Sequence, residues 1–194
     1  IHSFHLAENS HVKYIERHVG EGKGKGGKIL NPITKIYQKE NSFMEIETLQ
    51  LGGVTSSERK TFASLGENAH LDIQENILTE NTETATTSFK VTLKGRNSKV
   101  EVVSHSVAKG DSYQEFKSNL IGKNECFGHV ECDGIILDKA QIESVPKIIA
   151  QNVNATLVHE AAIGKIAGDQ LIKLETLGLT EEKAQAEIIK GFLK

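Results

Sequence analysis

The feature that most constrains this chain is a short repeat in which an asparagine precedes alternating apolar and polar residues. Most residues three and five positions after each asparagine are apolar, and those between them are mostly polar. A period of two is typical of a strand with one buried face, and asparagine tolerates the left-handed backbone of a turn. The asparagines are spaced 32, 27, 29, 27 and 28 residues apart, at Asn9, Asn41, Asn68, Asn97, Asn124 and Asn152.

A second strand-like run lies between successive repeats, at 28–37, 60–65, 86–93, 113–121 and 145–149. Two short strands in each repeat fit one coil of a flattened parallel β-helix, whose stacked coils bury a common apolar interior. An antiparallel β-sandwich is the alternative, but its usual hairpin marker occurs only at Asp133-Gly134. We therefore predict a mainly β fold, with a parallel β-helix over residues 1–160.

The pattern changes to a helical one over residues 161–194. Leu171, Leu174 and Leu177 fall on one helical face, and Gly178 stands where a helix commonly ends. Thr180 is placed to cap a second helix. We expect the two helices to form a lid over the open last coil, hiding its strand edge, although the same apolar faces could also dock a partner.

Composition excludes several classes of function. The net charge is −3, so no basic field attracts nucleic acid, and no apolar run reaches the length of a membrane span. Two cysteines cannot build a disulfide framework, so reduced thiols in a cytoplasmic protein are expected. Neither a catalytic triad spacing nor a dinucleotide fingerprint occurs, and the 5% of aromatic residues disfavour a polysaccharide-active enzyme. We predict a non-enzymatic protein and, since no initiator methionine is present, a fragment of a longer chain.

Three stretches could carry chemistry. The glycine-rich run from Glu21 to Lys28 lacks the ending of a phosphate-binding loop and is more simply a loop between coils. Cys126 and Cys132 are expected on one face of a strand and His129 on the other, so these three cannot hold one metal. In the repeat, however, His129 stands five residues after an asparagine, in a column of otherwise mostly apolar, inward-facing residues. There it is expected to be either a packed residue or a ligand.

The third stretch is His159-Glu160, whose adjacent side chains should point to opposite faces of a strand. A metal bound here would need ligands from a neighbouring coil or another chain. The residues seven positions after the repeat asparagines form a polar column, and His159 is its last member. A solvated corner is the simplest interpretation of this column. The column comprises Glu16, Thr48, Glu75, Ser104, Glu131 and His159.

Five stretches of the C-terminal third share the sequence of one known family: residues 129–137, Val145-Pro146, 159–166, 168–171 and Gly191-Phe192. Through them the chain resembles the SufB/SufD family, the scaffold subunits of the Suf iron–sulfur cluster assembly system. The resemblance is dense from about residue 122 onward and looser in the segment from Glu21 to Asn31. The cysteine that SufB proteins carry near residues 138–141 is absent here, as is the family's N-terminal helical region.

This resemblance implies a right-handed parallel β-helix closed by C-terminal helices, and a scaffold for nascent, transiently bound iron–sulfur clusters. It implies that a SufC-type ATPase docks on the C-terminal helices, and that the β-helix pairs as a homodimer or a SufB/SufD heterodimer. His159 and Glu160 match the family's His-Glu pair, and Cys132 is the nearby thiol, so these three are the predicted cluster-assembly residues. A metal-free structural or binding β-helix, in a SufD-like accessory role without cluster ligands of its own, is the alternative.

Overall fold

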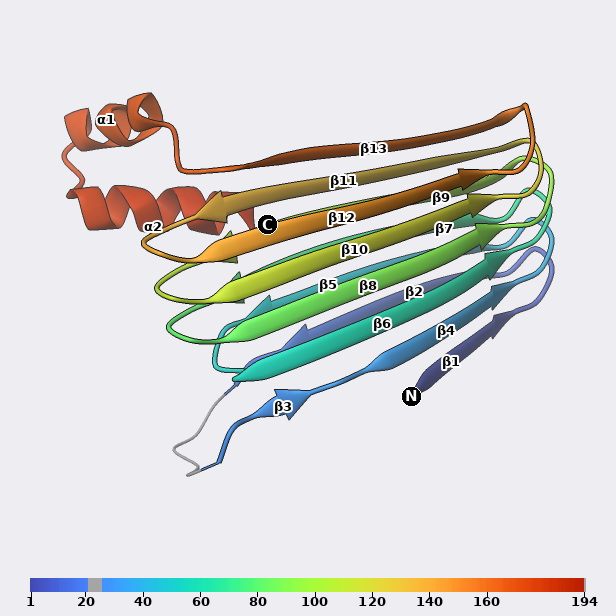
Figure 1. Cartoon of the computed structure of the whole chain (residues 1–194), viewed down its shortest axis with the longest axis horizontal. Coiled ribbons are helices and arrows are strands. Elements are labelled where there is room, and N and C mark those ends of the chain that lie inside the picture. Colours follow the sequence, from blue (N-terminus) through green and yellow to red (C-terminus); the bar gives the residue numbers. More distant parts are fainter. Residues whose placement is uncertain (21–25, 194) are drawn as a thin grey trace.

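The computed structural model describes residues 1–20 and 26–193, which form two facing parallel sheets and two C-terminal helices (Figure 1). Every strand pair in this part of the chain is parallel. The first sheet contains β1 (His2–Leu6), β4 (Ile33–Gln38), β6 (Ser56–Leu65), β8 (Thr84–Leu93), β10 (Tyr113–Gly122) and β12 (Gln141–Ala150), in that order, with β3 (Ile29–Leu30) beside β6. The second contains β2 (His11–His18), β5 (Phe43–Leu51), β7 (His70–Thr79), β9 (Ser98–Ala108), β11 (Cys126–Ile136) and β13 (Ala155–Gly164).

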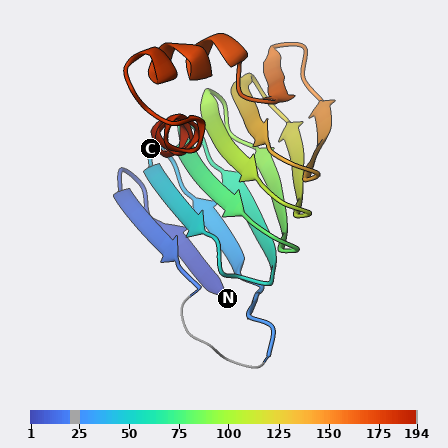
Figure 2. The ribbon, with the colours of Figure 1, turned by 90° about the vertical axis from the view of Figure 1, so that its left-hand side faces the viewer.

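The chain alternates between the sheets, so that one strand from each makes a coil of a parallel β-helix (Figure 2). This confirms the predicted fold, and the antiparallel sandwich is wrong. The inward residues of successive coils stack in register, as Met44, Leu71 and Val100 do, and none of these three is exposed. The last strand continues to Gly164, four residues beyond the predicted end of the β domain.

Asparagines mark the turns of the first four coils, as the repeat predicts. Asn9, Asn41, Asn68 and Asn97 all have a left-handed backbone, with φ between 52° and 59°. Asn68 donates its side-chain amide to Asn41 (3.0 Å), and Asn97 donates to Asn68 (3.3 Å), so a short ladder ties three coils together.

The repeat fails at the fifth coil. There Cys126 pairs with Ser98, so Glu125, and not Asn124, stands in line with Asn97. A shift of one residue moves every side chain of a strand to the other face. His129 therefore points outward, opposite Glu101 and Val158, and its predicted place in the interior column is wrong. In the sixth coil the strand is shifted by two residues relative to the predicted repeat. An even shift leaves each side chain of this strand on its predicted face.

The polar column is interior, and the interpretation as a solvated corner is wrong. Glu16, Thr48, Glu75 and Ser104 are all buried, and Cys132 follows them in register in place of Glu131. Burial is tolerated because Arg59, on the opposite sheet, donates to Glu16 (2.9 Å) and lies 3.6 Å from Glu75. The coil interior thus contains a polar layer beside its apolar core.

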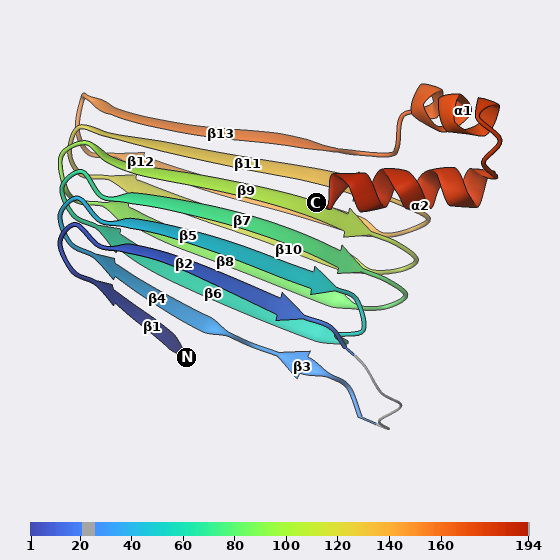
Figure 3. The same ribbon diagram turned by 180° about the vertical axis from the view of Figure 1, so that it is seen from behind.

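The two helices are α1 (Gly168–Thr176) and α2 (Glu181–Phe192), as the pattern predicts. Thr180 accepts a hydrogen bond from the backbone of Lys183, and Gly178 adopts a φ of 93° between the helices. They do not form a lid over the last coil. The second helix instead lies beside the ends of the second sheet (Figure 3), where its residues share a groove with Leu49, Leu51 and Leu78. Leu51 is exposed and the other two leucines are partly buried, so they offer the helix an apolar surface that explains its position.

Candidate functional site

The residues predicted to assemble a cluster lie in the last two coils, on β11 and β13. His159 pairs with Val130, and Glu160 pairs with Glu131. Because side chains alternate along a strand, Cys132 and His159 point into the coil and Glu160 points out of it. The structure thus brings His159 and Cys132 to one interior but leaves Glu160 on the other face of the sheet.

The interior part of the site is a small group of hydroxyl, thiol and imidazole side chains. The His159 ring bridges two serines, with Nδ1 3.4 Å from the hydroxyl of Ser118 and Nε2 3.4 Å from that of Ser144. Burial, and then the nearby His129, lower the pKa of His159 below its usual value. A neutral ring suits this position, because one nitrogen can donate to a serine while the other accepts.

The thiol of Cys132 is in a state that disfavours metal binding. Its side chain is fully buried, and this burial raises its pKa to about 11 although a hydrogen bond with Ser144 lowers it. Metals and clusters are bound by the thiolate. At neutral pH Cys132 is therefore a packed thiol, and so is Cys126, which is also buried and free. Among residues 1–20 and 26–193, four ligands suited to a cluster do not converge.

The outer part of the site is an imidazole between two carboxylates. His129 Nδ1 lies 3.9 Å from Glu101, and its Nε2 lies 3.8 Å from Glu160. The carboxylate of Glu160 is 68% exposed, so it is available to a ligand or a partner. Sequence reasoning missed Glu101, which stands beside His129 only through the pairing of β9 with β11. The expectation that His129 lies on the face opposite Cys126 and Cys132 is confirmed.

Residues 21–25 of the glycine-rich stretch lie outside the described residues, so its interpretation as a loop between coils stays a prediction.

Comparison with known proteins identifies the family. A model of the SUF system FeS cluster assembly SufBD core domain matches residues 2–192, nearly the whole chain. The chain belongs to the SufBD family. The match agrees with the predicted relationship and connects the chain with iron–sulfur cluster assembly.

Several SufBD relatives are similar along much of the chain. An iron–sulfur cluster assembly SufBD family protein of Methanothermobacter thermautotrophicus is 36% identical over 130 residues, 66% of this chain and 32% of that protein. One from Pyrococcus horikoshii is 28% identical over 98% of this chain and 58% of its own length. One from Synechocystis is 26% identical over 96% and 41%. The chain thus spans about a third to three fifths of these SufBD proteins.

The helices of the described part of this SufBD chain are short and mixed in polarity. None of them has the length and apolar character required to cross a bilayer.

Proposed function

We propose that this SufBD chain is a scaffold subunit on which iron–sulfur clusters are assembled as cargo, in the cytoplasm and together with a SufC-type ATPase. The observation that carries the proposal is the match to the SufBD core domain over residues 2–192. The open end of the β-helix adds support from the molecule itself.

That open end is formed by β12 and β13, each of which has one edge with no strand partner among the described residues. The last strand is exposed from Glu160 to Gly164, and Val145 and Ile148 on β12 are more than two fifths exposed. An unpaired edge with apolar neighbours invites pairing with another strand. Since neither helix covers this edge, a second SufB/SufD-type chain is its natural partner, as a homodimer or a heterodimer.

Pairing at this edge would also complete the ligands. Glu160 stands on the edge strand with its carboxylate outward, whereas His159 and Cys132 face inward. A cluster needs thiolates, so we expect the second chain to supply them and Glu160 to contribute an oxygen ligand from this chain. His159 then acts from the interior, through the serines that it bridges.

The ATPase has a suitable docking surface on α1. No residue of this helix is buried. Two apolar side chains are exposed, Ile172 within the helix by 61% and Leu177 at its C-cap by 76%. Exposed apolar residues on an amphipathic helix are typical of a surface that enters a partner's groove.

The burial of Cys132 favours a second candidate function. A chain whose thiols are both buried and free is also suited to an accessory role, in which it supports a cluster held entirely by its partner. The two functions differ in whether a cluster depends on Glu160.

The test is anaerobic copurification of the full chain with a SufC-type ATPase and a SufB-type partner, with iron and sulfide quantified. For the scaffold, Glu160→Gln should lower the bound iron and sulfide severalfold, whereas Glu143→Gln, on the exposed face of β12, should not. Unchanged iron and sulfide in Glu160→Gln would instead support the accessory role.

Docking of the ATPase is tested separately. Ile172→Glu with Leu177→Glu should abolish ATPase retention without lowering the unfolding midpoint, because α1 buries nothing. Val153→Glu is the matched control, since Val153 is fully exposed on a turn away from the helices. Retention of the ATPase by the double variant would contradict docking on this helix.

A further inference from the structure

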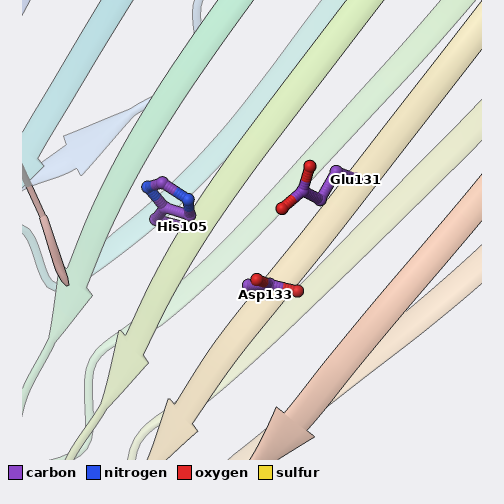
Figure 4. A group of neighbouring side chains, drawn as sticks. All are labelled: His105, Glu131 and Asp133. Atoms are coloured by element: carbon purple, nitrogen blue, oxygen red, sulfur yellow. The ribbon is translucent and has the colours of Figure 1, made fainter.

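Three side chains able to bind a metal converge on the outer face of the second sheet. His105 lies on β9 and pairs directly with Asp133 on β11, and Glu131 lies two residues before Asp133 on the same face. One ligand atom from each residue lies within 4.8 Å of the others. Figure 4 shows the imidazole and both carboxylates on the same side of the two strands. None of the three belongs to the cluster-assembly residues of the proposed function.

The charges of this group are not balanced by the protein. Across the described residues, most other acidic side chains on the strands have a cationic or histidine partner, such as Lys13 for Glu47 or Lys117 for Glu115. Neither the Glu131 nor the Asp133 carboxylate has an ion pair or a hydrogen bond within the part of the chain that the structure describes. Glu131 moreover lies directly opposite Glu160 on β13, and like charges at directly opposite positions destabilise a sheet.

The imidazole is also incompletely satisfied. Nδ1 of His105 is buried, and no hydrogen-bond partner for it lies among the described residues. The ring of Phe192, at the end of α2, packs on the His105 ring with centroids 4.9 Å apart. The helix therefore shields one side of the group from water, which strengthens electrostatic attraction at this position.

We propose that His105, Glu131 and Asp133 bind one divalent first-row transition-metal ion, such as Zn²⁺, on the outer face beneath the end of α2. One imidazole with two carboxylates is a nitrogen–oxygen set that suits such an ion, whereas Mg²⁺ and Ca²⁺ prefer oxygen ligands alone. The ion neutralises both carboxylates and engages the imidazole.

The binding geometry requires a small adjustment. Zinc bonds of about 2.0–2.2 Å place tetrahedral ligands roughly 3.3 Å apart, so the three atoms, now within 4.8 Å of one another, must approach by at most about 1.5 Å. Side-chain rotations of the two partly buried carboxylates can supply this movement without shifting the strands. Water completes the coordination on the open side.

The test is titration of the full chain with Zn²⁺ against a chromophoric chelator, comparing the wild type with Asp133→Asn and Glu131→Gln. We expect the wild type to bind one ion per chain. Loss of an outer-shell partner of a metal ligand typically weakens affinity by about 10–100-fold, so each variant, which removes a ligand, should weaken it at least that much. Mg²⁺ at the same concentration should not compete. Failure to bind Zn²⁺, or equal binding by all three proteins, would overturn the proposal.

Two controls separate this site from the rest of the molecule. Asp72→Asn removes a carboxylate that lies 2.7 Å from His70 on the same face, and Cys132→Ser removes the interior thiol. Both should bind Zn²⁺ within twofold of the wild type, as should Glu160→Gln, which keeps the result distinct from cluster assembly. A large loss of Zn²⁺ affinity in any of these three variants would show that the metal binds at a different site.

Thermal unfolding gives an independent reading that does not depend on the chelator. Without metal, Asp133→Asn should be at least as stable as the wild type, because it removes one of the unbalanced charges, so misfolding cannot explain its loss of binding. Added Zn²⁺ should raise the unfolding midpoint of the wild type but not that of the variant. Equal shifts in both proteins would contradict the proposed ligands.

Discussion

Replacement of the interior carboxylate Glu75 by glutamine should change how stability depends on pH. Glu75 is completely buried, and its burial raises its pKa from 4.5 to about 7, against the opposing influence of Arg59. Its oxygens accept hydrogen bonds from Thr87 (3.2 Å) and Ser104 (3.3 Å). These partners offset only part of the effect of burial on the pKa of Glu75, because Arg59 is shared with Glu16.

The sign follows from proton uptake. Between pH 4.5 and 7 the folded chain holds a proton on Glu75 that the unfolded chain has released, so the wild type loses stability as pH rises through this window. With about 1.4 kcal/mol for each pH unit, the loss attributable to Glu75 is about 3 kcal/mol. Glu75→Gln cannot titrate. As the pH rises from 4.5 to 8, its free energy of unfolding relative to that of the wild type should therefore increase by about this amount.

Urea unfolding of both proteins, followed by circular dichroism at half-unit steps from pH 4.5 to 8, measures this difference. Glu47→Gln, which removes a carboxylate from the outer side of the same sheet, controls for the loss of one negative charge. A difference between wild type and Glu75→Gln that stays constant within about 0.5 kcal/mol over this range would refute the reasoning.

Three further predictions concern the coil turns and the interior thiol. In urea unfolding, Asn68→Ala should lower the free energy of unfolding by about 1–2 kcal/mol, because alanine resists the left-handed backbone at this turn. Asn68→Gly should lower it by less, since glycine adopts that backbone freely. Equal losses would mean that only the amide ladder matters here. Gly95→Ala should lower stability by about 3 kcal/mol or more, since its Cβ would collide with the backbone of the preceding coil; a thermal midpoint like that of the wild type would contradict this. Cys132, with a pKa of about 11, has only about one thiolate in a thousand at pH 8, so its alkylation should be slow until urea unfolds the chain. Rapid labelling of the native protein at Cys132, located by mass spectrometry, would contradict its burial.

The fold was predictable because its signal is repeated. Each of the first four asparagines has the left-handed backbone that the spacing implies, and period-two alternation after it defines the buried face. The fifth turn broke the prediction, because Glu125 stands in the place expected for Asn124 and a one-residue shift reverses a strand's faces. Such a shift leaves no trace in composition and becomes visible only through strand pairing.

The polar interior was less predictable for a different reason. Glu75 belongs to the polar column for which the sequence alone favours a solvated corner, and its burial depends on Arg59, which comes from the opposite sheet. The expected strand began at Lys60 and so left Arg59 out, whereas β6 begins at Ser56. Likewise, His105 and Asp133 are neighbours only because their strands pair in this register.

The adjacent pair His159-Glu160 connects the two halves of the candidate site. Since both residues lie on the last strand, a chain that pairs along this edge would contact the outer carboxylate of Glu160 directly and His159 only from within the coil. The serines that His159 bridges belong to β10 and β12, so a change at the edge can reach the interior through the imidazole. If assembly follows the proposed function, substitution of the two residues should therefore lower it in different ways. Glu160→Gln removes the proposed oxygen ligand, whereas His159→Ala loosens the coil that presents it.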